Sequence, residues 1–148
     1  MIFQKTDPLD IDAIIREIDP ATATYPSAPE GLRIGHIHLR VGDIARAEAF
    51  YSGALGLDVT RRRTGATFLS SGGYHHHLAV NVWHSNGAGI RNGKRAGLGS
   101  FTMEVNDQPT IDGVKKRLDA AGITIDSIPG GFTATDPWGT CIRFTTAP

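Results

Sequence analysis

A motif near residue 34 recurs later in the chain, and this repetition is the strongest constraint on the fold. Residues 34–41 read IGHIHLRV and residues 98–105 read LGSFTMEV, so apolar and polar side chains alternate in both. Alternation with a period of two is typical of a β-strand with one apolar and one polar face. The match continues into the following residues, at the offset that separates His36 from Ser100. Such repetition indicates two similar units, each of which needs the other to cover its apolar face.

Each copy of the repeat predicts a strand, a helix and three further strands. Asp43 follows the first strand where an aspartate can cap a helix, and Gly56 suits the left-handed residue that ends one. The strands expected after the helices are residues 57–63, 66–70 and 74–83, then 123–128, 131–135 and 140–145. The sequence therefore predicts an α+β fold in which two βαβββ repeats form a curled mixed sheet around a cup. Apolar faces would pack under the helices, and polar faces would line the cup.

The chain divides by composition and by the repeat. The repeat domain is expected over residues 34–146, after an N-terminal helix and linker over residues 1–33. Asp7 and Pro8 are placed to begin the short helix, whose isoleucines offer an apolar face to the domain or to a second copy in a homodimer. The expected parts of the domain are the first repeat at 34–83, a linker at 84–97 and the second repeat at 98–146.

Charge and cysteine content bear on partners and on location. Lys and Arg total 15 and Asp and Glu also total 15, so the formal net charge is zero and gives no reason to expect a nucleic-acid partner. No apolar run reaches about 18 residues, so we expect no membrane-spanning helix and no membrane partner. Cys141 is the only cysteine, which favours a cytoplasmic protein.

Histidines gather on the predicted polar faces. His36 and His38 fall on the polar face of the first strand, and a run of three histidines occupies residues 75–77. Alternation would place the first and third members of this run on the cup face and turn His76 away. Because imidazole titrates near neutral pH, His36 and His38 are candidate catalytic acids or bases. The competing interpretation is that they are neutral histidines that only hydrogen-bond to their neighbours.

Arg143 lies on the polar face of the last predicted strand. An arginine enclosed in a cup needs a partner, either Glu104 in a structural salt bridge or a carboxylate or phenolate on a bound ligand. Trp83 offers a flat wall for a planar ligand, unless it only packs at the end of its strand. The candidate ligand-binding residues are therefore His75, His77, Trp83, Ser100, Glu104 and Arg143.

Three motifs carry a resemblance to a known family. The segment GHIHLRVGDIARAEAFYSGALGLDV resembles the first strand and helix of the vicinal oxygen chelate superfamily, which includes glyoxalase I, extradiol dioxygenases, fosfomycin resistance enzymes and bleomycin resistance proteins. The segment FLSSGGYHHHLAVNVW resembles the first module of bacterial catechol 2,3-dioxygenase-like proteins, and TDPWGTCIRF resembles the closing motif of the family. The resemblance covers about Leu32 to Thr145 and implies the glyoxalase/bleomycin resistance/dioxygenase fold.

The resemblance also implies where a metal would bind. Metal-dependent members take ligands from four equivalent strand positions, which here carry His36, Ala79, Ser100 and Arg143. Of these, His36 is the one good ligand for a divalent Fe, Mn, Ni or Zn ion, because an arginine stays protonated and repels a cation. The alternative donors for a displaced ion are His38, His75, His77 and Glu104.

The resemblance implies two functions, and whether the chain is an enzyme stays open between them. The first is a glyoxalase- or extradiol dioxygenase-like protein that binds a small aromatic or carbonyl-bearing anion, with a metal acting as a Lewis acid on vicinal oxygens. The second is a metal-free protein that binds or sequesters a small molecule, as bleomycin resistance proteins do. A third interpretation is a module that pairs with another chain.

Overall fold

The computed structural model describes residues 8–21, 27–28, 30–93 and 96–146, in two compact units that span Met1–Arg33 and Ile34–Pro148. The first unit holds helix α1 (Ile11–Arg16), which the Asp10 carboxylate caps by accepting a hydrogen bond from Ala13 N at 2.9 Å. The helix therefore begins after Pro8, whereas the predicted cap at Asp7 lies outside the described residues. The large apolar side chains of this segment are all exposed: Leu9, Ile11, Ile14, Ile15 and Ile18.

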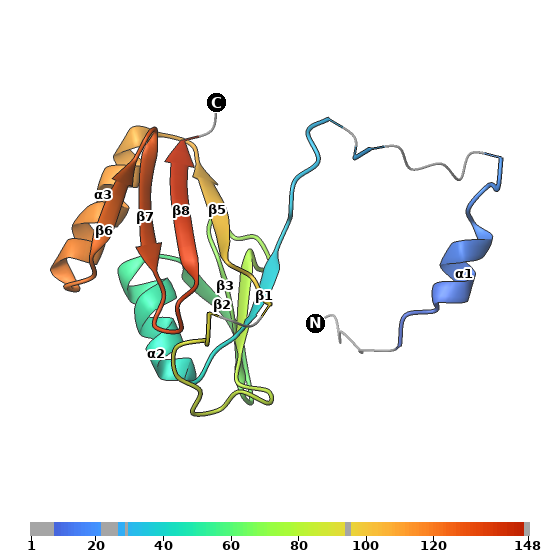
Figure 1. Ribbon diagram of the computed structural model, residues 1–148, viewed down its shortest axis with the longest axis horizontal. Helices are drawn as coiled ribbons and strands as arrows, with labels where there is room; N and C mark the ends of the chain where they lie inside the picture. Colours follow the sequence, from blue (N-terminus) through green and yellow to red (C-terminus); the bar gives the residue numbers. More distant parts are fainter. Residues whose placement is uncertain (1–7, 22–26, 29, 94–95, 147–148) are drawn as a thin grey trace. The chain divides into compact units, whose positions relative to one another are not determined.

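The second unit contains two repeats of a strand, a helical segment and three strands (Figure 1). The first repeat comprises β1 (Ile37–Arg40), α2 (Ile44–Glu48), η1 (Ala49–Ala54), β2 (Asp58–Arg63), β3 (Ala66–Ser70) and β4 (Leu78–Asn81). The second repeat comprises β5 (Ser100–Val105), α3 (Gln108–Ala120), β6 (Ile125–Ile128), β7 (Gly131–Thr135) and β8 (Cys141–Thr146). This order confirms the predicted α+β fold of two βαβββ repeats.

Each repeat forms its own four-stranded mixed sheet. The strand orders are β1-β4-β3-β2 and β5-β8-β7-β6, and in both sheets the first strand pairs with the last in parallel. The other strand pairs are antiparallel. The two sheets do not close into a barrel, and the exposed positions on their polar faces include His38, Arg40, Ser100, Thr102, Glu104 and Arg143. The polar faces are therefore open to solvent at these positions.

Capping residues set the start of the helix in each repeat. Asp43 and Asp107 have extended backbones, and their carboxylates accept hydrogen bonds from Arg46 N at 2.6 Å and Thr110 N at 2.8 Å. An aspartate in this position satisfies a backbone donor that the first helical turn leaves free. The first helix then continues as the π-helical segment η1, where Leu55 N donates to the carbonyl oxygen five residues earlier. Gly56, with φ of +86°, ends it as predicted.

One core joins the two repeats. Side chains from η1 and α3 pack with the apolar faces of both sheets, and Phe132 and Phe144 stack with their ring centroids 4.8 Å apart. Tyr51 of η1 donates its hydroxyl proton to Asp136, in the turn before β8, at 2.7 Å. Arg117 of α3 donates to the carbonyl oxygen of Leu55 at 2.9 Å. These bonds hold each repeat against the helix of the other.

The strand expected over residues 74–83 is shorter than predicted. Gly72 and Gly73 both have positive φ, and β4 begins only at Leu78. A positive φ is easy for glycine and turns the chain out of an extended course. The whole histidine run therefore lies in the loop before β4. None of the described helices is long enough and apolar enough to cross a membrane.

Candidate functional site

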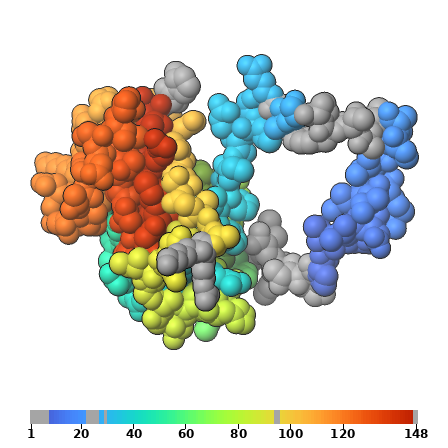
Figure 2. Space-filling view, in the orientation of Figure 1, coloured from blue at the N-terminus to red at the C-terminus, as the bar shows by residue number. Residues whose placement is uncertain are grey.

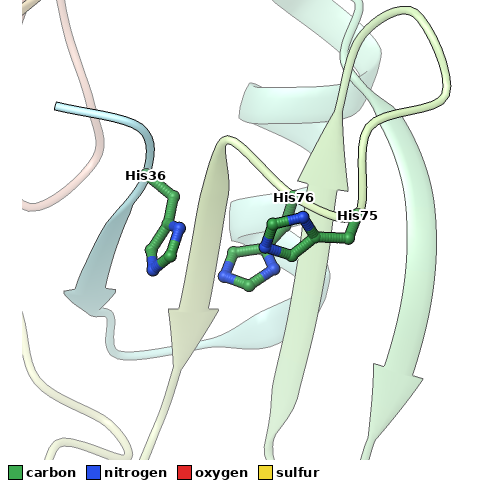
Figure 3. A group of neighbouring side chains, drawn as sticks. All are labelled: His36, His75 and His76. Atoms are coloured by element: carbon green, nitrogen blue, oxygen red, sulfur yellow. The ribbon is translucent and has the colours of Figure 1, made fainter. Parts of the chain in front are cut away.

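Four histidines gather at one end of the first sheet, and we call them the histidine cluster: His36, His38, His75 and His76. The ring centroids of His36 and His76 are 4.5 Å apart, as are those of His75 and His76. Nε2 of His38 lies 3.1 Å from Nε2 of His76, within hydrogen-bonding distance. Figure 3 shows His36 from the start of β1 and the pair from the loop before β4 turned toward one another.

The parallel pairing of β1 and β4 brings these residues together. Ile37 is in register with Leu78, and Ile37 N donates to the carbonyl oxygen of His77 at 3.0 Å. Because neighbouring parallel strands start at the same edge of a sheet, the residues just before each strand meet there. Thr60, at an irregularity in β2, donates its hydroxyl proton to the carbonyl oxygen of His75 at 2.8 Å. The loop is thus held from β1 and β2, the two outer strands of the first sheet.

His77 has a packing role beside the cluster. Its Nδ1 accepts a hydrogen bond from Ser71 N at 3.3 Å and lies 3.1 Å from the Ser70 hydroxyl oxygen. The ring of Tyr74 stacks on it, with centroids 4.8 Å apart and an interplanar angle of 29°. These contacts commit Nδ1 of His77 to its own loop, so this residue is a poorer candidate for ligand binding than its neighbours in the run.

The cluster keeps two of its imidazoles neutral. Partial burial, together with the neighbouring histidines, lowers the pKa of His76 to about 4. Burial and the charge of His36 also lower the pKa of His38. Protonating either ring would place a second positive charge among closely spaced imidazoles. At neutral pH these rings are therefore unprotonated and offer lone pairs that can bind a metal ion.

The lowered pKa predicts how stability depends on pH in the metal-free protein. The unfolded chain binds a proton at His76 near pH 6.5, whereas the folded chain binds it near pH 4. Between these values the unfolded state binds more protons, so stability falls as the pH falls through this window and levels off below it. Urea unfolding above and below this pH window should show a smaller loss of unfolding free energy in His76→Gln than in the wild type. An equal loss in both proteins would contradict the lowered pKa.

The second sheet carries three of the predicted residues on one face. In the parallel pair of β5 and β8, Arg143 lies opposite Thr102, while Ser100 and Glu104 are the next positions on that face. Both strands lie side by side at the surface in the space-filling view (Figure 2), gold and red by residue number. Arg143 is exposed, so its guanidinium can stay hydrated and the expected need for a partner in an enclosed cup does not arise.

Trp83 does not join the histidine cluster. It follows the carboxyl end of β4, whereas the cluster precedes the amino end of that strand. Its side chain is 51% exposed. The predicted aromatic wall therefore lies at the opposite end of β4 from the histidines.

His76 is the site residue that sequence reasoning missed. Alternation through the whole of residues 74–83 would turn it away, yet it contacts both His36 and His38. The signal that could have revealed this is Gly72-Gly73 directly before the run, since a glycine pair marks a turn rather than a continuous strand.

Comparisons with known proteins agree with this fold. The model of the Glyoxalase/Bleomycin resistance protein/Dioxygenase superfamily matches residues 33–144. A catechol-2,3-dioxygenase of Bacillus subtilis (strain 168) is 36% identical over 134 residues, which cover 89% of this chain and 46% of that protein. The chain thus spans about half the length of this curated relative.

Solved structures share the fold at lower sequence identity. A glyoxalase/bleomycin resistance protein/dioxygenase domain from Frankia sp. EAN1pec superposes with a TM-score of 0.62 at 18% identity, covering 79% of this chain and 98% of that one. A lactoylglutathione lyase from Agrobacterium tumefaciens superposes with a TM-score of 0.56 at 22% identity, covering 82% and 96%. Similarity at these identities shows the fold alone.

Proposed function

The chain belongs to the glyoxalase/bleomycin resistance protein/dioxygenase superfamily, and on that premise we propose that it binds a small organic anion, aromatic or carbonyl-bearing, on its polar sheet faces. Arg143 would pair with a carboxylate or phenolate of the ligand, with Ser100 and Glu104 beside it on the same face. In the metal-free protein, His36 and His38 would serve as acid and base. This assigns the chain to the glyoxalase- and extradiol dioxygenase-like proteins.

The observation that supports this proposal most is the exposed guanidinium of Arg143. It occupies the strand position where metal-dependent relatives are expected to offer a ligand. The guanidinium is permanently charged, so at this position it can hold the ligand oxygens that a metal ion would otherwise attract.

The inherited metal positions do not fit a metal. Ala79 is buried and has no donor atom, and Arg143 repels a cation. Ser100 and His36 alone supply too few donors for a divalent ion. We therefore infer a degenerate site at these four positions and derive no chemical step from a metal there.

The test is binding of a panel of small anions, such as benzoate and salicylate, by calorimetry in the presence of a chelator. Loss of a charge-assisted bidentate contact costs about 1.5–3 kcal/mol, so Arg143→Ala should weaken binding roughly ten- to hundredfold. Arg61→Ala is the matched control, because Arg61 is also an exposed strand arginine but lies in the first sheet. Equal affinities of both variants, or no binding by the wild type, would refute the proposal.

The alternative function is metal-free binding or sequestration without turnover. If the protein chemically converts a bound anion of the panel, the result favours an enzyme. If the anion is released unchanged, the result favours a binding protein. The wider proposal also includes a homodimer, supported by the exposed apolar side chains around α1, and a cytoplasmic location, supported by the single cysteine.

A further inference from the structure

We propose that His36, His75 and His76 form a binding site for one transition-metal ion of the kind that prefers imidazole ligands, such as Zn²⁺, Ni²⁺ or Cu²⁺. The site is distinct from the four inherited positions and shares only His36 with them. It also goes beyond the proposed function, because Arg143 needs no metal to bind an anion.

The spacing of the three imidazoles suits a single ion. One nitrogen from each ring lies within 4.8 Å of the others. Around a tetrahedral ion with metal–nitrogen distances of about 2.0–2.1 Å, ligand nitrogens lie roughly 3.4 Å apart. Side-chain rotations that move the nitrogens by on the order of 1 Å would bring them to the spacing that a tetrahedral ion requires. The rings in Figure 3 already face a common space.

The backbone that carries these ligands is anchored. The Thr60 hydroxyl holds the carbonyl oxygen of His75, and Ile37 N holds that of His77 at 3.0 Å. The imidazole of His77 accepts the backbone N–H of Ser71, which ties the end of the run back to β3. Anchoring of ligand-bearing residues on strand ends reduces the entropy that metal binding must overcome.

His38 supports the site from the side. With its Nε2 3.1 Å from Nε2 of His76, one of the two nitrogens carries a proton and the other accepts it. Ligand histidines are usually oriented by a hydrogen bond of this kind. We assign His38 as a positioning residue for His76 rather than as one of the three ligands.

The donor set selects the class of metal. Among the described residues, no carboxylate and no thiolate belongs to this group of potential ligands. Imidazole nitrogen suits Zn²⁺, Ni²⁺ and Cu²⁺, whereas Mg²⁺ and Ca²⁺ prefer oxygen donors. His36 and His75 are exposed, so an ion can enter and a fourth position stays open to water or to a ligand.

The test is titration of untagged, chelator-treated protein with Zn²⁺ alone and with Mg²⁺ alone. We expect one Zn²⁺ per chain, no Mg²⁺ binding, and at least a hundredfold weaker Zn²⁺ binding in His36→Ala, His75→Ala and His76→Ala. His84→Asn is the control, because His84 is an exposed histidine outside the cluster and asparagine tolerates its positive φ of 59°. His38→Ala should keep the stoichiometry and weaken binding about 10- to 100-fold.

Unchanged Zn²⁺ affinity in His36→Ala and His76→Ala would overturn the proposal, as would an equal loss in His84→Asn. So would the lack of stoichiometric Zn²⁺ binding by the wild type. Circular dichroism of each variant checks that the fold is retained, which we expect because these side chains lie at the surface. Since the metal titration contains no anion and the anion assay contains a chelator, the two proposals succeed or fail separately.

Discussion

Replacing Asp136 by alanine should lower the free energy of unfolding by about 3–5 kcal/mol, because it leaves several buried donors without an acceptor. Asp136 is 4% exposed and accepts hydrogen bonds from the Tyr51 hydroxyl at 2.7 Å, Trp138 N at 2.9 Å and Thr140 N at 2.7 Å. Burial and the neighbouring carboxylate raise the pKa of Tyr51 far above its ordinary range, so its hydroxyl stays a donor. Chemical denaturation followed by circular dichroism measures the loss.

Two variants give this prediction its controls. Asp126→Ala removes an exposed carboxylate from β6 and should change stability by less than about 0.5 kcal/mol. Asp136→Asn keeps the side-chain shape and one acceptor oxygen. Its loss of unfolding free energy should therefore fall between those of Asp136→Ala and Asp126→Ala. Similar stabilities of Asp136→Ala and Asp126→Ala would contradict the role of this carboxylate. The expected outcome matters for the site, because the Tyr51–Asp136 bond joins the first repeat to the turn that precedes β8.

Replacing Gly42 by alanine should cost about 2–4 kcal/mol, for a steric reason. A Cβ at this position would overlap the carbonyl oxygen of Ala88 and lie 2.7 Å from Nε1 of Trp138. That carbonyl accepts the indole N–H at 2.9 Å, and Gly87 N donates to the carbonyl oxygen of Gly42 at 2.7 Å. The variant must therefore push the chain at Ala88 away from Gly42 and weaken the hydrogen bond between the Ala88 carbonyl oxygen and Trp138.

Chemical denaturation measures the loss for Gly42→Ala, and Trp138 fluorescence in a Trp83→Phe background reports the broken indole contact. Gly89→Ala is the control from the same linker, since a Cβ there meets no atom within 4 Å. A shift of Trp138 emission together with reduced stability in Gly42→Ala alone is the expected pattern. Equal unfolding free energies of Gly42→Ala and Gly89→Ala would show that the chain at Ala88 can move without loss of stability, and would contradict the prediction.

Much of the fold could be predicted from local patterns. Alternation in residues 34–41 and 98–105 predicted the first strand of each repeat, and Asp43 and Gly56 marked the ends of the first helical segment. These features depend on neighbours in the chain, where caps, glycines and the two-residue period act directly on the backbone. The family resemblance followed from the same segments, and the match over residues 33–144 confirms it.

The candidate site was predictable only in part. His36 and His38 were predicted on the polar face of a strand, and the structure places both in the histidine cluster. His76 was predicted to point away, because alternation was extended through a run that Gly72 and Gly73 interrupt. The sequence did not determine whether the polar faces are closed off, and in the structure the two sheets form no barrel and leave Arg143 exposed.

The sequence by itself determined the two repeats, their helix caps and the polar character of one face of each sheet, because each depends on residues within a few positions of one another. The tertiary structure alone decided which histidines meet. That meeting depends on the parallel register of β1 with β4 and on the hydroxyl of Thr60 that holds the intervening loop. Both contacts join residues far apart in the chain, and the period of a single strand carries no information about them.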